Sequence, residues 1–169
     1  MNMQAQRYFI VLLGLMIGSY TMASDWRHSD SADQKLQNLI DALPGTSHWM
    51  FEVGERYNNL YWAAKQGKWE FAEYQVEEIE KLVQLVQLTR PKRAATAQEF
   101  LDSAIPPIKR AVESRQWNSF KFGFGQLSIA CMHCHVQNDH AFITLPPAPK
   151  GASSPVLNMG ATVLSPPVE

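Results

Sequence analysis

The chain has 169 residues, of which 46% are hydrophobic, so it can form one domain with a sizeable core. It carries 15 lysine and arginine residues against 16 aspartate and glutamate residues. Nucleic-acid-binding proteins show a basic excess, which this sequence lacks, so we expect no nucleic-acid partner.

The start of the chain has the pattern of a secretory signal peptide. Arg7 is its only charged residue, an apolar run covers residues 8–18, and the small-residue pattern of a cleavage site lies at residues 21–23. A membrane-spanning helix needs about 20 apolar residues, and this run is shorter. We therefore predict that residues 1–23 are removed on export, that the mature chain does not span the membrane, and that it is periplasmic.

Five segments have the apolar spacing of amphipathic helices, in which every third or fourth residue is hydrophobic. Pro44-Gly45, Gly67 and Pro91 separate the first four segments, because proline and glycine end helices. We predict one short packing helix and four longer helices, over residues 31–43, 46–66, 69–89, 96–112 and 116–136.

The third of the longer helices has two local signals. Thr96 and Glu99 have the spacing of a capping box, which predicts the start of the helix at this point. Pro106 and Pro107 lie inside the segment. Because proline lacks a backbone N–H and clashes with the preceding turn, we expect the helix to be kinked or divided there.

The connections between the four longer helices are short, which favours an up-down-up-down four-helix bundle. The helical pattern ends after Asn138, and residues 142–169 are rich in proline, glycine and serine. The predicted fold is therefore all-α, with a bundle, a short additional N-terminal helix and an irregular proline-rich C-terminal tail. The helical domain would cover residues 24–141, and the tail would cover residues 142–169.

The last predicted helix contains Cys131-Met132-His133-Cys134-His135, the Cys-x-x-Cys-His attachment sequence for c-type haem. Two such thiols form thioether bonds to the haem vinyl groups, and the adjacent imidazole binds the iron as its proximal ligand. At about 3.6 residues per turn, Cys131, Cys134 and His135 share one helix face, and His133 points nearly the opposite way. The sequence therefore predicts one covalent haem c, with His135 as the iron ligand.

The cysteine pair has alternative interpretations. A thiol-disulfide oxidoreductase would also use Cys131 and Cys134, but its motif normally opens a helix after a strand. A zinc site normally needs four protein ligands, and the sequence has no third cysteine. A helical interaction module with a structural haem is a further alternative. No hydrolytic triad or carboxylate pair stands out, so we do not expect an enzyme.

Alternating helix directions would bring the ends of all four long helices together around the haem. The first long helix would contribute the principal pocket candidates, Met50, Val53, Gly54 and Tyr57. The full candidate set from three helices is His48, Trp49, Met50, Phe51, Val53, Gly54, Tyr57, Val83, Val86 and Phe100.

The sixth iron position has Met50 as its best candidate, because this residue lies on the inner face in the first turn of its helix. A core methionine is the alternative interpretation. His48 is a second candidate ligand, whereas His140 follows His135 on the proximal side and is not expected there. Glycine is unfavourable inside a helix, so Gly54 indicates either close approach of the porphyrin or helix–helix packing.

Three basic residues fall in the turn at the predicted haem end, namely Arg90, Lys92 and Arg93. They could pair with the haem propionates or form a docking patch for an acidic redox partner. The alternative is a solvated turn without a binding role.

The haem motif on the last helix of a predicted four-helix bundle resembles the cytochrome c′ family. The resemblance covers about residues 46–146 and includes three further stretches, Glu52-Val53-Gly54-Glu55-Arg56, Leu60-Tyr61-Trp62-Ala63-Ala64 and Thr89-Arg90-Pro91-Lys92-Arg93. It implies thioether bonds at Cys131 and Cys134, a proximal ligand at His135, and one-electron transfer or small-gas binding at the iron. We expect a periplasmic redox partner protein, and a homodimer is an open alternative because dimers are common in that family.

Overall fold

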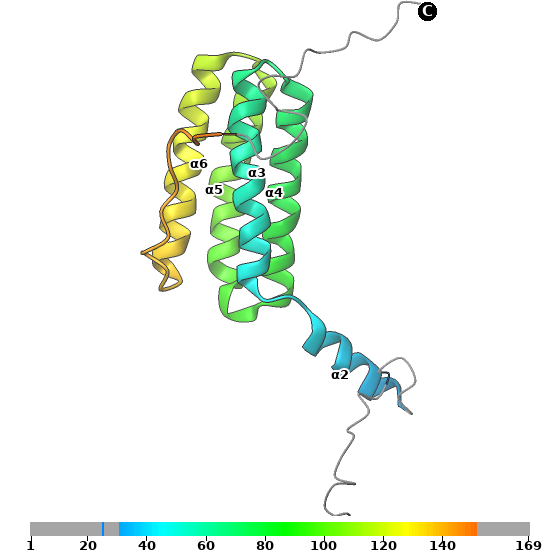
Figure 1. Ribbon diagram of the computed structural model, residues 1–169. Helices are drawn as coiled ribbons and strands as arrows, with labels where there is room; N and C mark the ends of the chain where they lie inside the picture. Colours follow the sequence, from blue (N-terminus) through cyan, green and yellow to red (C-terminus); the bar gives the residue numbers. More distant parts are fainter. Residues whose placement is uncertain (1–24, 26–30, 152–169) are drawn as a thin grey trace, which may run out of the picture. The chain divides into compact units, whose positions relative to one another are not determined.

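The four long helices predicted from the sequence are present in the computed structural model, which describes residue 25 and residues 31–151 (Figure 1). These described residues form α-helices and one short 3-10 helix and contain no strand, so the fold is all-α, as predicted. The predicted signal peptide and residues 152–169 of the predicted tail lie outside the described residues. Within the described part, no helix is long and apolar enough to span a membrane.

The short helix α2 (Ala32–Ala42) belongs to the first of two units into which the chain divides, Met1–Leu43. The Ser31 hydroxyl caps this helix by accepting a hydrogen bond from the backbone N–H of Gln34 at 3.1 Å. None of the residues of α2 is buried, and Leu36 is 58% exposed. The structure therefore confirms the short helix that we predicted.

The second unit, Pro44–Glu169, contains four long helices that lie side by side (Figure 1). Each helix packs against the next one in the chain, and the first also contacts the last. The connections are short, so neighbours in the sequence are also neighbours in space. The elements are α3 (Thr46–Lys65), α4 (Trp69–Thr89), the 3-10 helix η2 (Pro91–Arg93), α5 (Ala94–Glu113) and α6 (Trp117–Gln137).

The start of α5 differs from the prediction. The helix begins at Ala94, because Pro91 opens a 3-10 turn that runs directly into it. The Thr96 hydroxyl lies inside the helix and donates a hydrogen bond to the Arg93 carbonyl oxygen at 3.1 Å. The predicted capping box is therefore wrong.

Two interior prolines do not divide α5. Pro106 and Pro107 lie inside a helix that runs without interruption to its end. An interior proline costs about 3 kcal/mol in an isolated helix. The neighbouring side chains of Ala104, Ile105 and Ile108 are buried, and their packing offsets this cost.

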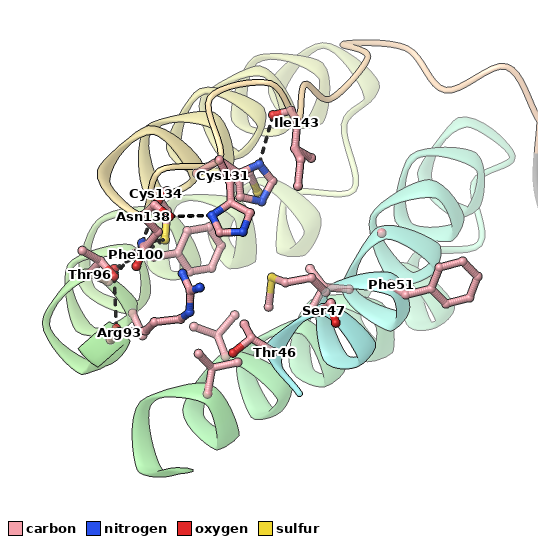
Figure 2. Close-up of a pocket in the computed structure, with 18 of the residues that line it drawn as sticks. Thr46, Ser47, Phe51, Arg93, Thr96, Phe100, Cys131, Cys134, Asn138 and Ile143 are labelled. Atoms are coloured by element: carbon pink, nitrogen blue, oxygen red, sulfur yellow. Dashed lines mark hydrogen bonds between the residues drawn. The ribbon is translucent and has the colours of Figure 1, made fainter. Parts of the chain in front are cut away.

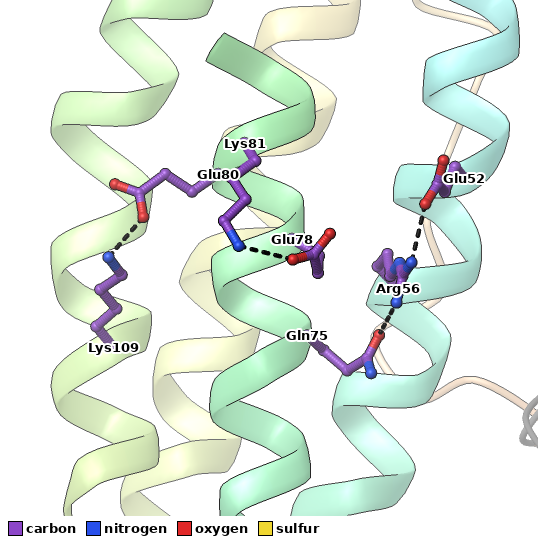
Figure 3. A network of polar contacts seen from close by, with 7 residues as sticks. All are labelled: Glu52, Arg56, Gln75, Glu78, Glu80, Lys81 and Lys109. Atoms are coloured by element: carbon purple, nitrogen blue, oxygen red, sulfur yellow. Dashed lines mark hydrogen bonds and ion pairs between the residues drawn. The ribbon is translucent and has the colours of Figure 1, made fainter. Parts of the chain in front are cut away.

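Polar side chains connect α3 to α4 and α4 to α5 (Figure 3). Arg56 on α3 donates to Glu52 at 2.9 Å, and its other terminal nitrogen lies 3.5 Å from Oε1 of Gln75 on α4. Glu80 on α4 forms an ion pair with Lys109 on α5 at 2.5 Å. Solvent-accessible ion pairs contribute at most about 1 kcal/mol each, and these pairs are only partly buried, so the apolar core supplies most of the stability.

The last helix, α6, is apolar on two opposite faces, of which only one is buried. Phe120, Phe124 and Leu127 lie in the core and are at most 1% exposed. Phe122 and Ile129 lie on the other face and are 72% and 58% exposed. Apolar spacing alone therefore does not determine which face of α6 turns inward.

A glycine sets the approach of α6 to α5. A Cβ atom added at Gly123 would lie 2.6 Å from the Cβ atom of Ala111 on α5. Real side chains do not approach one another this closely, so only glycine permits the observed contact. The contact holds the Gly123 face of α6 against α5.

We expect Gly123→Ala to destabilise this unit by about 1–3 kcal/mol, because the added methyl group must displace α5 from α6. The free energy of unfolding in urea, followed by circular dichroism, measures this change. Gly125→Ala is a matched control, because a Cβ atom there meets no atom within 4 Å. Alanine favours helices over glycine by about 0.5–1 kcal/mol, so Gly125→Ala should be neutral or stabilising. Equal losses from both substitutions would contradict the close approach.

Candidate functional site

A pocket of about 600 Å³ lies at the end of the second unit where α6 finishes (Figure 2). This volume falls within the range of about 300–1,000 Å³ that is typical of small-molecule and cofactor sites. Its lining comes from α3, α4, α5 and α6, the η2 turn and the segment after α6. The lining residues are Thr46, Ser47, Met50, Phe51, Val53, Gly54, Val83, Val86, Arg93, Thr96, Ala97, Phe100, Cys131, Cys134, His135, Asn138, His140, Ile143 and Leu145.

One wall of the pocket carries the Cys-x-x-Cys-His residues. Cys131, Cys134 and His135 all line it, because the helical spacing of α6 puts them on one face. His133 is on the surface instead, with its Nε2 atom 3.3 Å from Oε1 of Glu99. The structure thus brings together the three residues that the motif predicts to act together, and it leaves His133 outside, as expected.

The two cysteines are free thiols. Burial raises the pKa of Cys131 to about 12, and burial also raises the pKa of the half-buried Cys134. Both lie near the carboxyl end of α6, where the helix dipole disfavours negative charge. At neutral pH both are therefore protonated thiols with low reactivity.

The His135 imidazole is held by a backbone carbonyl. Its Nδ1 atom lies 3.1 Å from the carbonyl oxygen of Ile143 (Figure 2). A carbonyl oxygen only accepts hydrogen bonds, so Nδ1 must carry the proton and donate it. The lone pair of the neutral ring is then on Nε2, which is the arrangement in which histidine binds a metal through Nε2.

The α3 wall is mostly apolar and contains four of the predicted pocket residues, Met50, Phe51, Val53 and Gly54. Met50 is half-buried and, among the described residues, supplies the only thioether in the lining. A Cβ atom added at Gly54 would meet no atom within 4 Å. Helix–helix packing therefore does not explain this glycine, and the space that its missing side chain leaves belongs to the pocket wall.

Tyr57 does not line the pocket, although we predicted it there. Its ring stacks on Phe124 in the core with a centroid distance of 4.4 Å, and the residue is 3% exposed. Burial raises the pKa of its hydroxyl to about 12. Two other candidates, His48 and Trp49, are also outside the lining. His48 is exposed, and Trp49 is buried beneath the guanidinium of Arg90.

Residues 139–149, which we call the return segment, form a further pocket wall that we did not predict from the sequence. This segment is irregular, as predicted for the tail, but it packs against the helices. Asp139 has a φ of 65°, a left-handed conformation that turns the chain back after α6. Leu145 packs on the core, and the Tyr57 hydroxyl donates to the Pro146 carbonyl oxygen at 2.8 Å. The Asn-Asp pair after the last helical residue is the sequence signal for this turn.

His140 in the return segment also lines the pocket. Its Nδ1 atom hydrogen-bonds to the carbonyl oxygen of Asn138, and its backbone N–H donates to the His135 carbonyl oxygen at 2.8 Å. These bonds keep His140 beside His135.

Within the described residues, no three histidine, cysteine, aspartate or glutamate side chains lie close enough together to hold a metal ion directly. A haem iron needs only one or two axial ligands from the protein. Comparisons of the chain with protein-family models, curated proteins and solved structures found no match. The resemblance to the cytochrome c′ family therefore stays a prediction.

Alkylation by iodoacetamide can test the state of the thiols in protein produced without haem. In the Cys134→Ser variant, we expect Cys131 to react at least about a hundredfold more slowly at pH 8 than in the urea-unfolded chain, because each unit of pKa increase lowers the thiolate fraction about tenfold. In the Cys131→Ser variant, the half-buried Cys134 should react faster than Cys131 does. Reaction of Cys131 at the unfolded rate would instead favour a thiol oxidoreductase.

Proposed function

We propose that this chain is an exported c-type cytochrome that carries one covalent haem c and acts as a one-electron carrier, with small-gas binding as the other use of the same iron. The observation that carries the proposal is the pocket itself. Its α6 wall presents Cys131, Cys134 and His135 together, and its other walls are largely apolar. A flat, apolar cofactor that bonds to two thiols and one imidazole fits this distribution of groups.

The bundle is part of this proposal. We propose that α3 to α6 form an up-down-up-down four-helix bundle. In support, residues from the start of α3, the end of α4, the start of α5 and the end of α6 line one pocket. Helices that alternate in direction bring these ends together.

Different residues would hold different parts of the cofactor. The haem would supply an iron that exchanges one electron or binds a diatomic gas. Cys131 and Cys134 would fix its edge to α6, and His135 would reach it through Nε2. The Ile143 carbonyl oxygen accepts the hydrogen bond from Nδ1 of His135, which orients the ring and makes Nε2 a stronger electron-pair donor to a metal. Apolar side chains of α4 and α5, namely Val83, Val86, Ala97 and Phe100, would pack against the faces of the haem.

The competing thiol oxidoreductase lacks support from the chemistry of the site. Such enzymes lower the pKa of the attacking cysteine, usually at the start of a helix. Here burial raises the pKa of both thiols, and they lie near the end of α6. A helical interaction module whose haem is only structural is a second alternative, and reduction of the haem by a periplasmic donor protein at a useful rate would count against it.

Covalent haem attachment is the direct test. We expect the chain, exported from cells that mature c-type cytochromes, to gain the mass of one haem and to keep its colour after acid-acetone extraction. Replacing both Cys131 and Cys134 by serine should abolish the covalent gain, because no thiol remains to bond the vinyl groups. His133→Ala is the control and should keep the haem, because His133 lies outside the pocket. A colourless exported protein with two titratable thiols would refute the proposal.

Met50 is the candidate for the sixth iron position, since it supplies the only thioether in the pocket lining. We expect an absorption band at about 695 nm, which is typical of thioether ligation to haem iron, and its loss in Met50→Ala. Met132→Ala is the matched control, because Met132 lies on α6 outside the lining. A wild-type spectrum without this band, unchanged by Met50→Ala, would remove Met50 as a ligand and favour gas binding.

A further inference from the structure

Arg93 is the only lysine or arginine among the described residues that line the pocket. It ends the η2 turn between α4 and α5. Figure 2 shows its side chain extending from this turn towards the pocket interior. The polar end of the side chain is thus directed at the space that a ligand would occupy.

The other basic residues of the turn, Arg90 and Lys92, do not line the pocket. The Arg90 guanidinium donates to the Thr89 carbonyl oxygen at 2.8 Å and to the Pro44 carbonyl oxygen, and it lies 5.0 Å from the centre of the Trp49 ring. It therefore ties the start of α3 to the end of α4. Lys92 is exposed and does not line the pocket.

The Arg93 guanidinium has no hydrogen bond or ion pair with any described residue. Arg93 and Cys134 line the same pocket. A half-buried cation beside apolar walls is unfavourable unless it meets an anion. The planar fork of arginine matches a carboxylate with two parallel hydrogen bonds.

Two hydroxyl groups lie near the same edge of the pocket. Thr46 and Ser47 belong to the first turn of α3, which begins without a side-chain cap. Figure 2 places both residues and Arg93 along one edge of the pocket. Hydroxyl groups and a helix start favour negative charge, so this edge differs chemically from the apolar walls.

We infer that Arg93 binds a carboxylate of the pocket ligand and thereby fixes the orientation of that ligand. The inference rests on the proposed function, in which the ligand is haem and the carboxylate is a propionate. The propionate edge then lies against Arg93, Thr46 and Ser47, and the vinyl edge lies against Cys131 and Cys134. Arg93 is a binding and positioning residue, which keeps the propionate ionised and compensates its charge beside the iron.

The test is the reduction potential of the haem-loaded protein as a function of pH. In Arg93→Gln, the propionate loses its cation, so its pKa rises and its protonation becomes coupled to oxidation of the iron. We expect a lower potential that depends on pH in the neutral range, and Arg93→Lys should restore part of the wild-type behaviour.

Lys92→Gln is the matched control, because it removes the same charge from the neighbouring position outside the pocket. Its potential should shift by less than about half as much, without new pH dependence, because solvent screens an exposed charge. Equal shifts from the two substitutions, or no pH dependence in Arg93→Gln, would overturn the role of Arg93. A wild-type protein without covalent haem would overturn the proposed function instead, so the two failures are distinguishable.

Discussion

The rotation of α6 about its own axis is the constraint on which the pocket depends. Because α6 is apolar on two faces, hydrophobic burial does not by itself choose the inward one. The close approach of Gly123 to Ala111 selects one rotation, and that rotation buries Phe124. Cys131 follows about two helical turns later on the same side, so the contact that packs the middle of the helix also directs the thiols inward.

Local sequence patterns predict most of the helices. The features that depend on contacts between residues far apart in the sequence were not predicted. The spacing of apolar residues, with glycine and proline as breaks, places α3, α4 and α6 within about two residues of their observed ends. The short connections also predict which helix ends meet. The return segment was not predicted, because it depends on contacts such as the hydrogen bond from Tyr57 to Pro146, which lies 89 residues later. Tyr57 was wrongly predicted in the pocket lining for the same reason. The predicted start of α5 was wrong because the η2 turn leads into the helix before the expected cap.

The opposing walls of the pocket differ in their donor chemistry. The α6 wall offers two thiols and an imidazole that the Ile143 carbonyl holds in place, whereas the α3 wall offers one thioether, at Met50, among apolar groups. Under the proposed function, the α6 wall would determine whether the cofactor is attached. The α3 wall would determine whether the iron exchanges electrons or takes up a gas, because a bound thioether blocks the position that a gas would need.

The meeting of four helix ends at one pocket couples occupancy to folding. A ligand there contacts α3, α4, α5 and α6 at once, so it takes the place of core side chains that this end lacks. Any ligand that binds only the folded chain raises the free energy of unfolding, by an amount that grows with the ratio of the free ligand concentration to the dissociation constant. For a dissociable ligand, that contribution disappears on dilution. A ligand bonded to both cysteines has a local concentration that dilution does not change, so the folded chain would keep this stabilisation however scarce the free cofactor becomes.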